Sequence, residues 1–98
     1  MIFKIIFTPD AENDIQNASD YYFNRVSQKV GLSFFTDLNS SLDSIEQNPY
    51  YQTRVKNFRA LPLKKFPYIL FFELFEENKI VKVIALFNTY QTPEKYPS

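Results

Sequence analysis

The sequence predicts an α+β fold, because its two halves have different hydrophobic periods and the change falls near Pro49. In the first half apolar residues recur every three or four positions, as on the buried face of an amphipathic helix. In the second half they form short continuous runs separated by polar or proline-containing turns, as in the strands of a sheet. The chain of 98 residues has the length of one domain, so we expect a single domain over residues 1–98.

The first half is expected to form one strand and a helical hairpin. Residues 2–7 are apolar and rich in β-branched and aromatic side chains, which favours a strand. Thr8 and Pro9 fit the N-cap and the first position of a helix that the apolar spacing extends to about residue 28. A second stripe predicts a helix over 30–47, and the short link between the two favours antiparallel packing. The first stripe consists of Ala11, Ile15, Ala18, Tyr22 and Val26, and the second of Phe35, Leu38, Leu42 and Ile45.

The second half is expected to form three strands, over 58–63, 68–75 and 80–87. The middle run is almost continuously apolar, as is typical of a central strand covered on both faces. A polar turn at 76–79 joins it to the last strand as a hairpin, and residues 88–98 are expected to be irregular. The predicted order is β-α-α-β-β-β, with the helical hairpin packed on one face of a small, mostly antiparallel sheet.

Several classes of site are excluded by composition. The sequence contains no Cys and no His, which excludes disulfides, thiol nucleophiles and the commonest general base and transition-metal ligand. The only glycine is Gly31, so a glycine-rich phosphate loop is excluded as well. Asp10 and Asp14 lie one helical turn apart, but acids at a helix start stabilise its dipole, and we expect no metal site and no cofactor. No run approaches the roughly 20 apolar residues of a membrane span, so a cytoplasmic location and no membrane partner are expected.

The formal net charge of zero conceals an uneven distribution of charge. Residues 1–50 carry three basic and seven acidic residues, whereas residues 51–98 carry eight basic and four acidic ones. The segment 47–72 contains no acidic residue, and its five basic residues suggest an anion- or partner-binding surface. We expect Arg59 on the sheet face opposite the helices, where its guanidinium would bind phosphate. The basic residues are Arg54, Lys56, Arg59, Lys64 and Lys65.

Each candidate also has an ordinary structural interpretation. Arg59 would then be a strand residue paired with a carboxylate, and Lys64 and Lys65 would belong to a solvated polar turn. Tyr90 and Tyr96 in the C-terminal segment would either stack on a base or donate a proton, or instead fix the segment against the domain.

Three parts of the chain resemble the RelE/ParE superfamily of toxins. The first is residues 11–15 (AENDI) followed by 20–22 (DYY), the second is 59–71 (RALPLKKFPYILF), and the third is 85–89 (ALFNT) with 93–96 (PEKY). The second is the most specific, and together they span nearly the whole chain. The resemblance implies a β-α-α-β-β-β toxin of a type II toxin–antitoxin system, held inactive in a hetero-oligomer with a co-expressed antitoxin.

The resemblance leaves the cellular target open between two branches of the family. One branch cleaves mRNA on the ribosome, and the ParE branch inhibits DNA gyrase. Many members carry a His after the last strand and an Arg shortly beyond, where this chain has Asn88 and Tyr90-Gln91. Because gyrase inhibition asks for no hydrolytic chemistry, a ParE-like toxin is the leading hypothesis.

Two alternatives remain. In a ribosome-dependent mRNA endoribonuclease, the RNA 2′-OH would attack the adjacent phosphate. Arg59 and Lys65 would stabilise the developing charge, and Tyr90 or Tyr96 would assist proton transfer. The other alternative is an inactive relative that only binds the antitoxin. Under every hypothesis we expect an acidic antitoxin segment across residues 54–65, in a complex that weakens with added salt.

Overall fold

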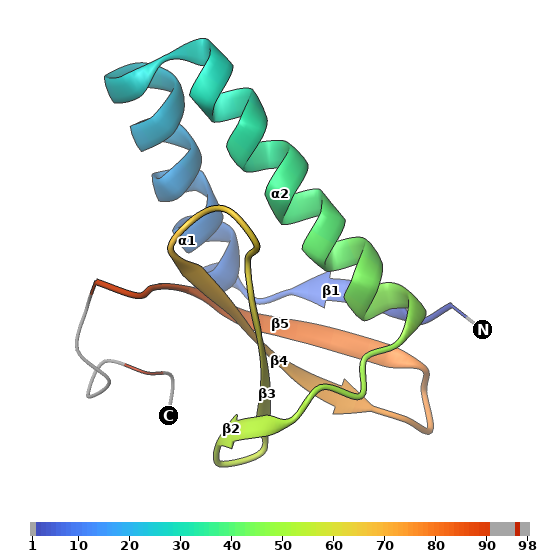
Figure 1. Ribbon diagram of the computed structural model, residues 1–98. Coiled ribbons are helices and arrows are strands. Elements are labelled where there is room, and N and C mark those ends of the chain that lie inside the picture. The colour runs from blue at the N-terminus through green and yellow to red at the C-terminus, as the bar shows by residue number, and fades with distance from the viewer. Residues whose placement is uncertain (1, 91–95, 97–98) are drawn as a thin grey trace.

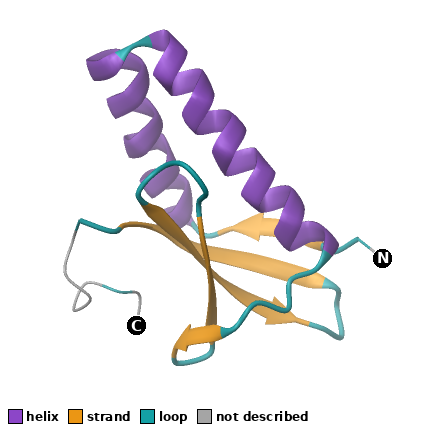
Figure 2. Cartoon of the chain, viewed as in Figure 1, coloured by secondary structure: helices purple, strands orange, loops and turns teal. Residues whose placement is uncertain are grey.

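The computed structural model of the protein describes residues 2–90 and residue 96. A helical hairpin forms one layer and packs across one face of a five-stranded sheet, which forms the other (Figure 1, Figure 2). The predicted α+β class and the predicted order of elements are confirmed. None of the helices in this described part of the chain has the length and apolar character needed to cross a bilayer.

The first helix, α1 (Pro9–Asp20), begins where the sequence predicts. Thr8 Oγ1 accepts a hydrogen bond from the Ala11 amide at 3.1 Å, and proline in the first turn loses no hydrogen bond there. The Thr8 hydroxyl also donates to the Ile84 carbonyl at 3.1 Å. The side chain that starts the helix therefore also attaches it to the sheet.

A π-helical turn, η1 (Tyr21–Val26), lies between α1 and the long helix α2 (Gln28–Gln47), where the sequence predicts continuous α-helix. Its wider turn changes the direction of the side chains that follow, so Val26, expected in the buried stripe, is 50% exposed. Gly31 of α2 packs against this turn. A Cβ at this position would lie 2.5 Å from the Phe23 ring, so glycine is what allows the close approach.

The buried face of α2 differs by one position from the predicted stripe. Phe34 is fully buried, whereas Phe35, which the prediction placed in the core, is 42% exposed. Leu38 and Ile45 are buried as predicted. A spacing of three or of four residues before Leu38 fits one helical face equally well, so the sequence pattern could not choose between the two phenylalanines.

The strands are β1 (Lys4–Phe7), β2 (Thr53–Val55), β3 (Phe58–Pro62), β4 (Tyr68–Phe75) and β5 (Ile80–Asn88). Their order in the sheet is β1-β5-β4-β3-β2, so β4 is central, and β3, β4 and β5 form the predicted antiparallel meander. β1 pairs with β5 in parallel, which makes the sheet mixed. The short strand β2 lies where the sequence predicts no strand, and it extends the sheet beyond β3.

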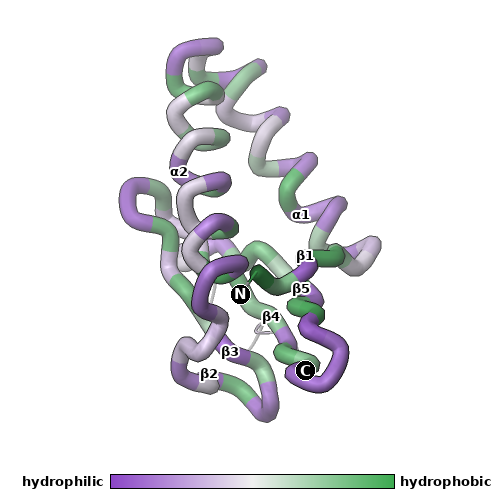
Figure 3. Tube along the Cα trace, turned by 90° about the vertical axis from the view of Figure 1, so that its right-hand side faces the viewer, coloured by the Kyte–Doolittle hydropathy of each residue, from purple (hydrophilic) through white to green (hydrophobic). Residues whose placement is uncertain are grey.

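The main hydrophobic core fills the space between the helices and the sheet. Phe34 and Leu38 of α2 meet Leu70 and Phe72 of β4 there. Hydrophilic and hydrophobic residues alternate along both helices, as expected of amphipathic helices with one face on the core (Figure 3). A smaller cluster lies on the opposite face of the sheet, because the side chains of β4 alternate between the two faces. It contains Ile69, Phe71 and Phe87, with Tyr96 packed against them.

Candidate functional site

Four of the five predicted basic residues lie in two pairs, one beyond each end of β3. Arg54 and Lys56 are exposed on the β2–β3 hairpin, and Lys64 and Lys65 are exposed in the loop that joins β3 to β4. Arg59 belongs to neither group, because it lies within β3 and is half-buried. The structure thus brings the basic residues together in pairs, which differs from the single surface expected over residues 54–65.

The predicted position of Arg59 on the sheet face opposite the helices is wrong. Arg59 lies directly across from Phe72 of β4, which belongs to the core beneath the helices. Residues directly opposite in neighbouring strands share a face, so Arg59 is on the helix side. Its Nη1 donates a hydrogen bond to the Tyr51 carbonyl at 2.7 Å. The guanidinium therefore holds the segment before β2 against the sheet.

The loop carrying Lys64 and Lys65 is fixed by a buried carboxylate from α2. Asp37, only 5% exposed, accepts hydrogen bonds from three consecutive backbone amides. The donor–acceptor distances are 3.3 Å from Lys64, 2.9 Å from Lys65 and 3.0 Å from Phe66. Consecutive backbone amides of this kind form a concave site for an anion. Here the bound anion is the carboxylate of Asp37 itself.

Asp37 is absent from the site residues predicted above, although its position in the sequence carries a signal. An acidic residue stands directly before Leu38 in a stretch of helix whose spacing predicts burial. A charged group at such a position must have partners, because an unpaired buried charge is costly. The exposed side chains of Lys64 and Lys65 therefore extend from a loop whose backbone is held by Asp37.

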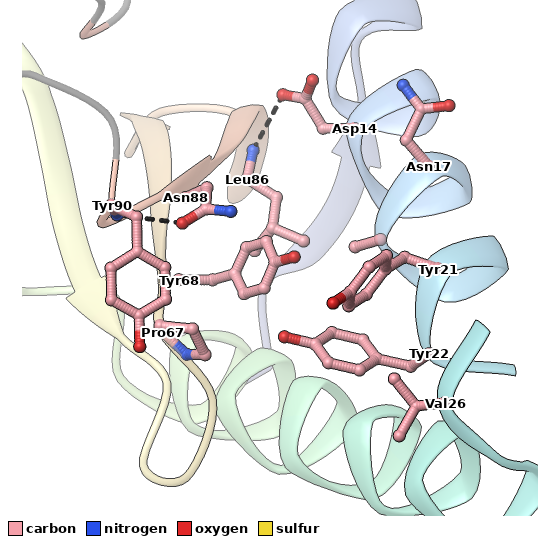
Figure 4. Close-up of a pocket in the computed structure, with 11 residues that line it drawn as sticks. Asp14, Asn17, Tyr21, Tyr22, Val26, Pro67, Tyr68, Leu86, Asn88 and Tyr90 are labelled. Carbon is pink, nitrogen blue, oxygen red and sulfur yellow. Dashed lines mark hydrogen bonds between the residues drawn. The ribbon is translucent and has the colours of Figure 1, made fainter.

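A cleft of about 600 Å³ opens between η1 and the ends of β4 and β5 (Figure 4). Tyr21 and Tyr22 from η1 face Tyr68 from β4, and the three hydroxyl groups gather at its centre. The ring centroids of Tyr21 and Tyr22 are 5.1 Å apart, and those of Tyr22 and Tyr68 are 6.2 Å apart. We call this the tyrosine cleft. Its polar lining is completed by Asp14, Asn17, Asn88 and Tyr90.

Asp14 connects α1 to the open edge of β5. The pairing of β1 with β5 ends at Val83, so the amides beyond it need other partners. The Asp14 Oδ2 atom accepts a hydrogen bond from the Leu86 amide at 3.1 Å (Figure 4). Burial raises the pKa of Asp14 above its usual value, and the nearby Asp10 charge adds to the effect, although the Leu86 bond opposes it.

Tyr68 is the most buried of the four tyrosines that line the cleft, with 8% of the residue exposed. Burial, followed by a side-chain hydrogen bond with Tyr22, raises the pKa of Tyr68 well above that of a free phenol. Tyr68 is therefore a neutral hydrogen-bonding group at physiological pH. Within residues 2–90 and Tyr96, no three acidic side chains lie close enough together to hold a metal ion.

Comparison with protein families gives a match to the ParE toxin of type II toxin–antitoxin systems, parDE, over residues 5–93. The chain belongs to the ParE toxin family. The resemblance to the RelE/ParE superfamily is thereby confirmed, and this ParE-family chain carries the fold expected for it. No curated protein sequence matches it significantly.

Solved structures share the fold of this ParE-family chain at low sequence identity. The chromosomal ParDE toxin–antitoxin system from P. aeruginosa is 16% identical with a TM-score of 0.74, covering 89% of this chain and 96% of that one. The intact E. coli RelBE complex is 16% identical with a TM-score of 0.62, covering 88% and 95%. The RelBE2 complex from Mycobacterium tuberculosis is 11% identical with a TM-score of 0.59, covering 90% and 99%.

The candidate catalytic residues of this ParE-family chain lie on different sides of the sheet. Tyr96 is half-buried on the face away from the helices, with its ring centroid 5.1 Å from that of Phe71 and 4.7 Å from that of Phe87. Arg59 is on the helix side. Tyr90 is 84% exposed at the rim of the tyrosine cleft. The segment 91–95 lies outside the described residues.

Proposed function

We propose that this protein is the toxin of a bacterial type II toxin–antitoxin system, that it inhibits DNA gyrase in the cytoplasm by protein–protein contact, and that a cognate antitoxin neutralises it in a hetero-oligomer. The family match over residues 5–93 carries the proposal. It also supports a single toxin domain over residues 1–98. Gyrase inhibition, unlike RNA cleavage, requires no set of acid, base and charge-stabilising groups at one phosphate.

The separation of the candidate catalytic side chains favours contact-based inhibition over RNA cleavage. Cleavage needs its groups within a few ångströms of one reacting phosphate. Arg59 and Tyr96 are on opposite faces of the sheet, and the Arg59 guanidinium already donates to the Tyr51 carbonyl. The sequence also contains no histidine to act as a general base.

The antitoxin contact proposed here uses the two exposed basic pairs. Arg54 and Lys56 lie before the start of β3, and Lys64 and Lys65 lie just after its end. No acidic residue occurs in the segment 47–72 that carries both pairs. An acidic antitoxin segment that follows β3 would meet both pairs, and such exposed charges govern the association rate and its dependence on salt.

The proposal is tested by inducing the gene in bacteria, with and without the product of the adjacent gene. We expect growth arrest that the neighbouring product relieves, an induced DNA-damage response and no new mRNA 5′ ends by primer extension. Purified protein should inhibit supercoiling by gyrase. A copy without a start codon controls for effects of the transcript.

The other outcomes identify the alternatives. New 5′ ends on translated messages, with undisturbed supercoiling, would show an endoribonuclease and overturn the gyrase proposal. Normal growth of cells that accumulate the folded protein, together with tight binding to the neighbouring product, would show an inactive antitoxin-binding relative.

A further inference from the structure

The tyrosine cleft lies beside a helix that carries only negative charge. From Pro9 to Asp20, α1 contains four acidic residues and no Lys or Arg. One of the four, Asp14, reaches the cleft, and no basic residue lines the cleft in the described part of the chain. The cleft is thus opposite in charge to the basic pairs on the loops around β3. The acidic residues of α1 are Asp10, Glu12, Asp14 and Asp20.

The aromatic lining adds a second attraction for a cation. Tyr21 is 50% exposed and Tyr90 is 84% exposed, so their rings are available to an incoming group. Tyr22 and Tyr68 are more enclosed and form the inner part of the cleft. A cation held over an aromatic ring interacts favourably with the negative face of the ring. A carboxylate among four tyrosines is therefore suited to a positively charged planar group.

The cleft and the lysine loop are neighbours in the structure. Pro67 lines the cleft and stands only two residues after Lys65. The ring centroid of Phe66 lies 5.0 Å from that of Tyr22, which joins the loop to η1. A single extended segment of a partner could therefore reach both places, provided that its own charge changes sign between them.

We propose that the tyrosine cleft receives an arginine side chain of the antitoxin, in a segment that also places acidic residues on Lys64 and Lys65. The identity of the partner rests on the proposed function. Arginine fits better than lysine because its flat guanidinium stacks on tyrosine rings while its fork donates to acceptors such as the Asp14 carboxylate and the Asn17 and Asn88 side chains.

The environment of the Asp14 carboxylate in the free protein also favours an arginine in the cleft. Its carboxylate is partly desolvated and lies near Asp10, so the ionised form is less stable than it is in water. A guanidinium beside it would offset both effects. π-helical turns such as η1 also occur often at functional sites, and this one supplies both Tyr21 and Tyr22 to the cleft.

The first test titrates the isotope-labelled full chain with N-acetyl-arginine methylamide and follows the amide signals by NMR. We expect saturable shifts at Leu86 and along η1, and binding roughly tenfold weaker for the citrulline analogue, which has the same shape but no charge. Equal binding of the two probes, or shifts confined to other parts of the molecule, would overturn the proposal.

Matched variants distinguish a loss of binding caused by the missing charge or ring from a loss caused by a disturbed fold. Asp14→Asn keeps an oxygen that can accept from the Leu86 amide, and it should weaken the arginine probe by roughly tenfold. Asp20→Asn removes the same charge from an exposed position of α1 outside the cleft and should leave binding within about twofold. Tyr21→Phe should retain binding and Tyr21→Leu should weaken it by about two- to fivefold, because only the latter removes the ring.

The second test measures antitoxin affinity for the same variants. Asp14→Asn should weaken the complex by roughly tenfold and Asp20→Asn should not. Undiminished affinity of the Asp14→Asn and Tyr21→Leu proteins would overturn this inference while the proposed function stands. Specific binding of the arginine probe without any neutralising antitoxin would instead support the chemistry of the cleft and overturn the proposed function.

Discussion

The Asp37 carboxylate accepts a hydrogen bond from the Lys65 amide at 2.9 Å, although 28 residues separate the two along the chain. This contact joins α2 to the loop between β3 and β4, and the amides of Lys64 and Phe66 share the same carboxylate. The loop that displays the two lysines therefore depends on a residue of the opposite layer. Changing Asp37 should affect the loop and the stability of the fold together.

Asp37→Ala should lower the free energy of unfolding by about 1–3 kcal/mol, because it leaves amide donors in a partly buried loop without their acceptor. Urea denaturation followed by circular dichroism measures this loss. Asp43→Ala, at an exposed position of the same helix, is the control and should change stability by less than about 0.5 kcal/mol. Equal effects of the two substitutions would contradict the role assigned to Asp37.

Gly31→Ala should destabilise the fold by about 1–3 kcal/mol, because the new methyl group would overlap the Phe23 ring. The predicted loss is a net value, because alanine by itself would stabilise the helix by about 1 kcal/mol relative to glycine. In a Phe23→Ala background the overlap is gone, and the same substitution should become neutral or stabilising. A double-mutant cycle measures the difference, and purely additive effects would refute the steric explanation.

Asp14→Asn should increase stability at neutral pH, because burial raises the pKa of Asp14 in the folded protein above its unfolded value. A raised carboxyl pKa means that the folded state binds the proton more tightly. The ionised group therefore lowers stability as the pH rises from the unfolded pKa through the folded one, and the loss persists above it. The advantage of the variant should disappear in acid, below the usual Asp pKa. Unfolding curves at neutral and acidic pH test this, and a constant advantage would contradict it.

Arg59→Ala should lower the free energy of unfolding by about 1–3 kcal/mol, since the charged donor to the Tyr51 carbonyl is lost. Because Arg59 is on the helix side, the variant should remain toxic at temperatures where it is folded. Growth arrest and thermal unfolding are measured side by side. A fully folded variant that no longer arrests growth would place Arg59 in the functional surface after all.

Replacing Lys64 and Lys65 together by Gln should weaken antitoxin binding and reduce its dependence on salt, because both lysines are exposed charges at the proposed contact. Calorimetric titration at low and high ionic strength provides both quantities. Lys29→Gln, an exposed lysine at the start of α2, is the control. An affinity of the unmodified protein that does not change with salt would exclude electrostatic docking.

The sequence by itself determined most elements of this protein, all except η1 and β2, because the signals of the others are local. The Thr8-Pro9 start of α1, the central apolar strand β4 and the hairpin to β5 were all predicted from short windows of sequence and are confirmed. The family resemblance was also carried by contiguous motifs and is confirmed. For the site, the sequence contains the tyrosines, the acidic residues of α1 and the basic segment. It does not show how they are arranged in space.

The tertiary structure decided which side chains meet. Arg59 is beneath the helices because its register with Phe72 fixes its face, and a shift of one residue would have reversed it. Phe34 rather than Phe35 is in the core because α2 packs on the sheet with the Phe34 side facing β4. The tyrosine cleft likewise assembles residues from both ends of the chain. Such contacts depend on packing between distant segments, which no local pattern of residue types encodes.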